Sequence, residues 1–192
     1  GRTLVGLDVA LVSDLPQGVG LGSSTAVTLA FIHAWEALAG FELDTLSRAH
    51  LAQKTEKAYV GVQAGLMTPF VCAASQANQL LFVNGRSFTH HLFPLPANLS
   101  LVLVDSAEQG HASILRARAR ECPAATAVLQ QHLPHIKTLR DVTADELELF
   151  GHHLPKPLRR RASHAVGECS RVQAAAFALQ SGDLPALGRL LR

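Results

Sequence analysis

The sequence predicts an α+β fold in two parts, a mixed α/β part up to Pro96 and a helix-rich part after it. Short apolar runs of strand type occur in the first part, whereas helical periodicity continues from Ser113 to the end. The 192 residues are 48% hydrophobic and 17% charged, which suffices for one or two compact domains and argues against disorder. We therefore expect one domain over residues 1–96 and a second over residues 97–192.

In the first part, the spacing of apolar residues predicts a strand followed by two helices. Apolar and other residues alternate over residues 4–11, which is typical of a strand with one buried face. Apolar residues at helical spacing after Ala26 predict a core helix that ends before Gly40. Asp44 is a suitable N-cap for a second helix, which we expect to reach about Ala58.

Three short apolar runs follow, and they predict strands over residues 80–83, 88–92 and 101–104. Asn84-Gly85 separates the first two runs and favours a hairpin between them. In the helix-rich part we find five candidate helices and no convincing strand. The candidate helices cover residues 113–121, 124–132, 143–150, 157–180 and 183–191.

Charge and composition argue against several classes of protein. The formal net charge is only +2, and the basic residues are scattered except for the run at 159–161, which we interpret as a solvated helix face. Such a distribution is unlike a nucleic-acid-binding stripe. No apolar run approaches the ~20 residues of a membrane span. Three widely spaced cysteines fit unpaired thiols in a reducing compartment, so we expect a cytoplasmic protein with neither nucleic acid nor membrane as partner.

The most informative stretch is a glycine and hydroxyl loop between the predicted first strand and first helix. Gly18, Gly20 and Gly22 permit positive φ angles and a close approach of the backbone to a ligand. Ser23 and Ser24 follow where a helix N-terminus presents free N–H groups and the positive end of its dipole. This arrangement can bind phosphate and leave a hydroxyl for Mg²⁺. The alternative is an ordinary glycine-rich turn with a serine N-cap. The loop does not match the common P-loop, because no Lys ends it.

Residues 16–24, Pro-Gln-Gly-Val-Gly-Leu-Gly-Ser-Ser, resemble the second signature of the GHMP kinases, a Pro-x-Gly-x-Gly-Leu-Ser-Ser-Ser loop around the ATP phosphates. Residues 52–61 and 65–67 are similar to the galactokinase stretches Ala-Gln-x-x-Glu-x-x-Phe-Val-Gly and Gly-Ile-Met. Segments at 160–168 and 182–190 resemble the helical second half of galactokinases. Because these matches run in order along nearly the whole chain, it is identified as a galactokinase-like member of the GHMP kinases.

The resemblance implies the GHMP kinase fold, in which a ribosomal-S5-domain-2-like α/β part, here lacking its first strands, precedes a helix-rich part of the C-terminal domain. It implies ATP and Mg²⁺ as cofactors and a sugar or another hydroxyl compound as substrate. Ser24 and Glu56 are the implied Mg²⁺ ligands. Glu56 shares the small-residue helix face of Ala49 and Ala52, although an exposed Glu near a helix C-terminus is the alternative. The implied ATP-binding residues are Gly18, Val19, Gly20, Leu21, Gly22, Ser23 and Ser24.

The catalytic base that the resemblance implies is missing. Thr68 stands where galactokinases have the Asp after Gly-Ile-Met, and Pro69 stands where a Gln is usual. A Thr hydroxyl cannot hold a proton reversibly near neutral pH, and a positioned base is worth ~10²–10⁴ in rate. Leu115 falls where a galactose-binding Tyr is implied, so we expect an altered sugar pocket. Glu108 and His111 on the same loop are either substitute bases or plain loop residues.

Three readings of function remain open. One is a galactokinase-like ATP-dependent sugar kinase with impaired or altered catalysis, and a second is a catalytically silent homologue that senses nucleotide or sugar and signals through a partner. The third is a merely structural remnant. The family's N-terminal galactose-binding signature and its third, glycine-rich signature have no counterpart between Gly1 and Arg192. We therefore expect either a piece of a longer protein or a reduced homologue.

Overall fold

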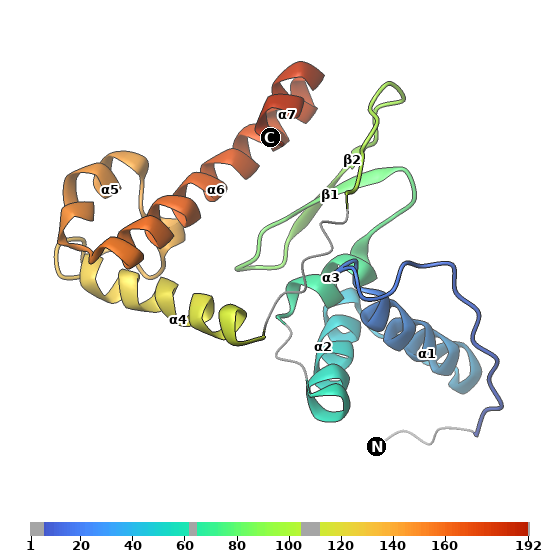
Figure 1. Cartoon of the computed structure of the whole chain (residues 1–192). Helices are drawn as coiled ribbons and strands as arrows, with labels where there is room; N and C mark the ends of the chain where they lie inside the picture. The colour runs from blue at the N-terminus through green and yellow to red at the C-terminus, as the bar shows by residue number, and fades with distance from the viewer. Residues whose placement is uncertain (1–5, 62–64, 105–111, 192) are drawn as a thin grey trace. The chain divides into compact units, whose positions relative to one another are not determined.

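The computed structural model describes residues 6–61, 65–104 and 112–191, with side chains for all of these except 112–116. Contacts divide the chain into unit 1, Gly1–Asp105, and unit 2, Ser106–Arg192 (Figure 1). This division falls after Asp105, whereas the sequence places a domain boundary after Pro96. Assigning the two units to the two domains of a kinase stays a prediction.

Three helices form the core of unit 1: α1 (Ser23–Ala39), α2 (Thr45–Thr55) and α3 (Met67–Ala74). Helices α1 and α3 both pack against α2. The two predicted helices are confirmed, because α1 ends at Gly40 with φ 65° and the Asp44 carboxylate caps α2 by accepting the N–H of Ser47 at 2.9 Å. A short π-helix, η1 (Glu56–Val60), continues directly from α2.

The predicted hairpin is also present in unit 1. Strands β1 (Gln79–Val83) and β2 (His90–Pro94) pair antiparallel, with Leu81 opposite Leu92. The connecting turn is longer than Asn84-Gly85 alone and closes through the N–H of Asn84, which donates to the carbonyl of Thr89 at 2.8 Å. Phe88 in this turn lies 5.1 Å from the ring centre of Phe70 on α3, so the hairpin is packed against the helices.

The strands predicted at 4–11 and 101–104 were wrong for the residues that the structure describes. Residues 6–11 and 101–104 form no strand, and their apolar side chains are exposed except for the half-buried Leu7, as shown by 60% for Leu11 and 82% for Val102. A strand requires a neighbour whose backbone completes its hydrogen bonds. In the described parts of the chain neither segment has such a neighbour, and alternation along one segment cannot reveal whether a partner is present.

Unit 2 is helical throughout its described residues. It consists of α4 (Ala112–Leu129), α5 (Ala144–Phe150), α6 (Lys156–Ser181) and α7 (Leu184–Leu190), with 3-10 turns η2 (Leu139–Asp141) and η3 (Gly151–His153). Helix α6 packs against α4, α5 and α7. The buried core between them is apolar. Its members are Ala125, Leu129, Leu133, Ile136, Leu139, Val142, Leu147, Leu154, Ala162 and Val166.

The two helices predicted at 113–121 and 124–132 are a single helix, α4, which continues through Pro123. A proline inside a helix leaves the carbonyl four residues earlier without its N–H donor. That residue is Ala119, which lies on an exposed part of α4, so water can satisfy the carbonyl. Among the helices in the described ranges, none is long and apolar enough to cross a membrane.

Candidate functional site

The glycine loop lies directly before α1 and leaves the start of that helix open. Gly18, Gly20 and Gly22 have φ angles of 75°, 79° and 78°, which residues with a Cβ rarely adopt. Gly22 is the N-cap of α1, and no side chain caps the helix. A Cβ at Gly18 or Gly20 would meet nothing within 4 Å. The loop therefore presents free backbone N–H groups and the positive end of the α1 dipole to open space, which is the geometry of an anion site.

Glu56 approaches the start of α1 from the α2 side. The hydroxyls of Ser24 and Thr25 both donate to its Oε1 at 2.7 Å. Glu56 is 4% exposed, so the alternative of a solvated Glu near a helix end does not hold. It is also the residue at which α2 passes into the π-helix, where the Gly61 N–H donates to the Glu56 carbonyl at 3.0 Å. Such π-helical turns occur frequently at functional sites.

The surroundings of Glu56 fit a magnesium ion. In the parts of the chain that the structure describes, no Lys or Arg pairs with this carboxylate, and no group hydrogen-bonds its Oε2. A buried carboxylate without a cation is costly. Carboxylate and hydroxyl oxygens beside phosphate oxygens are the ligands that Mg²⁺ usually takes in phosphate-binding sites. No cluster of three or more His, Cys, Asp or Glu is found in the described ranges, so any metal here would be held by the Glu56 carboxylate, a hydroxyl such as that of Ser24, and oxygens of a bound phosphate.

Two side chains of α3 lie against the last glycine of the loop. A Cβ on Gly22 would lie 3.0 Å from Thr68 Cγ2 and 3.3 Å from Cys72 Sγ. Burial, reinforced by the negative charge of Glu56, raises the pKa of the Cys72 thiol, so it stays protonated at neutral pH. Thr68 lies in the first turn of α3 and is exposed. The loop, Glu56 and Thr68 thus belong to one surface of unit 1.

Comparison with known proteins bears on the family of the chain. A family model described as the GHMP kinases N terminal domain matches residues 1–76. Galactokinase from Roseiflexus sp. (strain RS-1) is 39% identical over 193 aligned residues, which cover 100% of this chain and 49% of that protein. This chain is a galactokinase-like member of the GHMP kinase family.

Other galactokinases support the same assignment. Galactokinase from Chloroflexus aurantiacus is 35% identical to this galactokinase-like chain over 98% of it and 49% of that protein. The crystal structure of Lactococcus lactis galactokinase complexed with galactose superimposes with a TM-score of 0.74 at 24% identity, over 93% of this chain and 47% of that one. The predicted GHMP kinase fold is thereby confirmed. The chain spans about half the length of the relatives that it matches.

Within this galactokinase-like chain, the structure brings residues 18–24, Glu56 and Thr68 together in unit 1. Leu115 lies in α4, but its side chain is outside the described residues, as are Glu108 and His111 entirely. The sequence analysis missed the roles of Thr25 and Cys72. Cys72 lies four residues after Thr68 and shares its face of α3, but the sequence does not show that this face packs against the loop. Thr25 directly follows Ser24, and its hydroxyl was the available signal.

Proposed function

We propose that this chain binds the triphosphate of ATP together with Mg²⁺ and contributes the nucleotide site of a sugar kinase. The observation that supports this most directly is the pairing of Ser24 with a buried Glu56 at the uncapped start of α1. The sugar substrate is inferred from the galactokinase names of the relatives and from the galactose complex of the Lactococcus lactis protein. The described cysteines form no disulfide, which supports our proposal of a cytoplasmic protein.

Each element of the site has a defined part in this proposal. Backbone N–H groups of residues 18–24 donate to phosphate oxygens, and the α1 dipole favours their negative charge. Ser24 and Glu56 supply oxygen ligands for Mg²⁺, which when bound neutralises charge on the phosphates. Thr25 holds the Glu56 carboxylate in place by donating to its Oε1. The loop glycines allow the close approach because their positive φ angles need no side chain.

We propose further that catalysis is impaired or altered at Thr68. Its side chain lies beside Gly22, where a proton acceptor could serve a hydroxyl that attacks the terminal phosphate. A Thr hydroxyl cannot take up that proton at neutral pH. Phosphoryl transfer depends mainly on positioning and electrostatics, so we expect turnover reduced by ~10²–10⁴ and not abolished.

A second candidate function is a silent homologue that binds nucleotide or sugar and signals through a partner. The contacts around Gly22 favour it. The two side chains nearest to a Cβ there belong to Thr68 and Cys72, and the raised pKa of Cys72 means that neither group accepts a proton at neutral pH. A chain with an intact phosphate loop and no base would bind ATP and rarely consume it.

The two functions are separated by phosphorylation of a panel of sugars, followed by mass spectrometry. Thr68→Asp restores a carboxylate, and Thr68→Asn is its matched control of nearly equal shape without the charge. Position 68 lies in the first turn of α3, where an acidic group is tolerated by the helix dipole. For an impaired kinase we expect the Asp variant to gain at least about tenfold in rate and the Asn variant to gain nothing.

Other results would change the proposal. Rapid turnover by the natural chain, with no gain in Thr68→Asp, would show that another group is the base. ATP binding without turnover in any variant would favour the sensor.

To test binding itself, Gly20→Ala is compared with Gly188→Ala by calorimetric titration with Mg·ATP. A Cβ meets nothing within 4 Å at either glycine, but only Gly20 has a positive φ, so we expect only Gly20→Ala to weaken binding, by about tenfold or more.

A further inference from the structure

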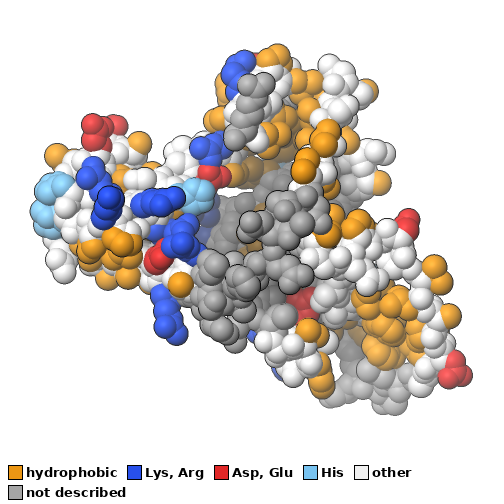
Figure 2. All heavy atoms as spheres, viewed as in Figure 1, with side chains coloured by type: hydrophobic (Ala, Val, Ile, Leu, Met, Phe, Trp, Pro, Cys, Tyr) orange, Lys and Arg blue, Asp and Glu red, His pale blue; other side chains and the backbone are white. Residues whose placement is uncertain are grey.

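Unit 2 contains a basic cavity, at the point where α6 begins beside α4. Its volume is about 530 Å³, within the size range of small-molecule sites. Five of its six lining side chains are basic or can become so. The cavity is lined by Arg118, Lys156, Pro157, Arg160, Arg161 and His164. Lys and Arg side chains gather over this part of unit 2 in the space-filling view (Figure 2).

Two of the arginines are held in position by one carboxylate. Glu121 of α4 accepts from Arg118 Nη1 at 2.6 Å and from Arg161 Nε of α6 at 2.9 Å. The carboxylate is 20% exposed, and these bonds lower the pKa of Glu121, so it stays ionised at neutral pH. Glu121 thereby connects α4 to α6 and fixes the guanidinium groups of Arg118 and Arg161 at the cavity wall. Each guanidinium keeps further N–H donors for a ligand.

Of the other basic side chains, His164 Nδ1 lies 3.9 Å from Glu168 Oε1, whereas Lys156 and Arg160 have no such partner among the described residues. Lys156, Arg160 and His164 follow one another at intervals of four residues and therefore share one face of α6. Lys156 and Arg160 are exposed, and the structure shows no ion pair for either within its described residues. Among the described residues, Glu121 is the one carboxylate that pairs with the four Lys and Arg of the lining, which leaves an excess of about three positive charges. Excess charge of one sign around a hollow attracts counter-ions of the other sign.

The start of α6 adds to this positive potential. The helix is 26 residues long, and its N-cap, Pro155, makes no side-chain cap. Its first turn supplies Lys156 and Pro157 to the cavity wall, so uncapped N–H groups and the positive dipole end lie beside the basic side chains. Sequence analysis interpreted the arginine run at 159–161 as a solvated face, and Arg159 and Arg160 are indeed exposed, whereas Arg161 is half-buried. Within that face, Arg160 and Arg161 line this cavity and Arg159 lines a different hollow.

We propose that this cavity is a second anion site, which binds a small molecule carrying a diphosphate or two phosphate groups. The charge excess suits a ligand with several negative charges, and Arg with Lys is the usual set of phosphate ligands. A compact hollow without aromatic lining favours a small ligand over a nucleic-acid strand, which needs an extended stripe and stacking surfaces. The site lies wholly in unit 2 and does not depend on the glycine loop of unit 1.

The test is a residue-resolved NMR titration of the whole 192-residue chain with inorganic pyrophosphate, without Mg²⁺. We expect shifts of the amide signals of residue 156 and residues 158–161, distinct from any at the glycine loop. The double variant Lys156→Gln/Arg160→Gln removes two exposed charges and should weaken binding at these amides at least about tenfold. The control double variant, Arg159→Gln/Arg189→Gln, changes the net charge by the same amount outside the cavity. It should leave the affinity for pyrophosphate within about twofold of that of the natural chain.

Three outcomes would overturn the proposal. Shifts confined to the glycine loop would leave a single anion site in this chain. Equal loss in both double variants would show that net charge, and not the cavity, attracts the ligand. Displacement of pyrophosphate by a short single-stranded oligonucleotide at lower concentration would indicate a nucleic-acid surface. Circular dichroism of each variant establishes that the helical unit is still folded, so a loss of binding cannot arise from unfolding.

Discussion

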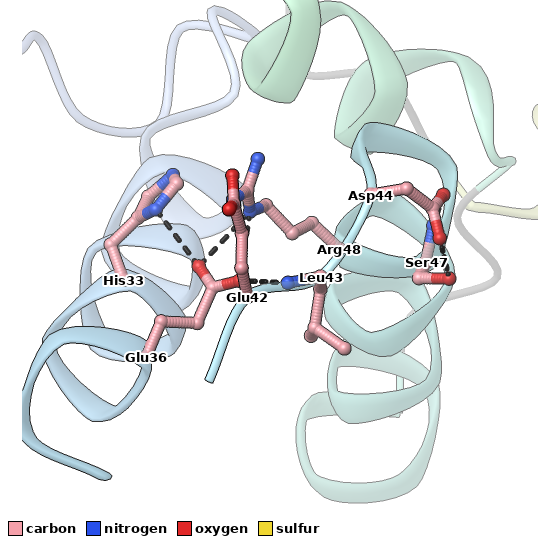
Figure 3. A network of polar contacts seen from close by, with 7 residues as sticks. All are labelled: His33, Glu36, Glu42, Leu43, Asp44, Ser47 and Arg48. Carbon is pink, nitrogen blue, oxygen red and sulfur yellow. Dashed lines mark hydrogen bonds and ion pairs between the residues drawn. The ribbon is translucent and has the colours of Figure 1, made fainter. Parts of the chain in front are cut away.

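Unit 1 buries two glutamates in different ways. Glu36 of α1 is 7% exposed and Glu56 is 4% exposed. Glu36 accepts from Arg48 Nε at 3.0 and 3.1 Å, from the Leu43 N–H at 2.5 Å, and faces His33 Nδ1 at 3.1 Å (Figure 3). Glu56 accepts only from hydroxyls in the described part of the chain. Because a buried carboxylate without a cation is costly, Glu36 has its cation within the protein, and our proposal that Glu56 takes an external cation, Mg²⁺, follows from the contrast.

The cation beside Glu36 has a measurable consequence. Burial acts to raise the pKa of Glu36, but hydrogen bonds from Arg48 and the Leu43 backbone outweigh it, and the pKa lies below its ordinary value. Arg48 in turn is only 16% exposed, so both partners of the pair are held in the protein. The pair joins the end of α1 to α2. The glycine loop precedes α1, and Glu56 directly follows α2.

The largest effect is expected from removing the cation of the structural pair. Arg48→Met leaves the buried Glu36 charge without its partner and should lower the free energy of unfolding by about 3 kcal/mol. Urea unfolding followed by the fluorescence of Trp35, the only Trp, reports on α1. Lys54→Met removes an exposed charge from the same helix and should cost about 0.5 kcal/mol or less. Equal losses in the two variants would mean that the Glu36 pair is not structural.

The next prediction neutralises each carboxylate in turn. Glu36→Gln should cost about 2 kcal/mol of unfolding free energy, because charged hydrogen bonds to Arg48 are lost. Glu56→Gln keeps an acceptor for the two hydroxyls and should change that free energy by about 0.5 kcal/mol or less, while Mg·ATP binding weakens at least about tenfold. Calorimetric titration and urea unfolding measure both quantities. If Glu56→Gln destabilised the fold as much as Glu36→Gln and left nucleotide binding intact, Glu56 would be a structural residue too.

Thr25 tests how far the positioning of Glu56 matters. It is 3% exposed, and Thr25→Val removes a hydrogen bond to the carboxylate with little change in volume. We expect a loss of about 1 kcal/mol in stability and a weakening of Mg·ATP binding by about threefold. Thr126→Val is the matched control, since it removes a buried hydroxyl that bonds the Cys122 carbonyl at 3.0 Å within α4. Nucleotide binding unchanged in both variants would separate Thr25 from the site.

Some elements of unit 1 were predicted correctly from the sequence. Helices α1 and α2 were predictable because Gly40 and Asp44 mark their ends locally, and the turn at Asn84 marks the hairpin in the same way. Proximity of the glycine loop to Glu56 followed from family resemblance, with burial supported by the small residues on that helix face. The segments at 6–11 and 101–104 could not be predicted correctly, because a strand depends on a partner that local periodicity does not reveal.

Features that depend on how helices pack could not be predicted from the sequence. The contact of Cys72 with the loop depends on how α3 packs, which no motif encodes. The continuity of α4 through Pro123 depends on an exposed carbonyl that water can satisfy, whereas the residue type alone favours a break. The basic cavity depends on the crossing of α4 and α6, since Arg118 is far in sequence from Arg160. The roles of Thr68 and Leu115 stay predictions.

The smallest effect concerns pH, and its sign follows from the structural pair. Because the folded pKa of Glu36 lies below its unfolded value, the stabilisation is complete above the unfolded pKa and is lost as the pH falls through the folded pKa. Asp44, Glu121 and Glu146 also have lowered pKa values, so the natural chain and Glu36→Gln both lose stability in acid. We therefore expect urea unfolding between pH 7 and about pH 3 to show that the difference in free energy of unfolding between the natural chain and Glu36→Gln becomes smaller as the pH falls below about 4.5. A constant gap would mean that Glu36 contributes through packing and not through its charge, and the contrast with Glu56 would then lose its electrostatic basis.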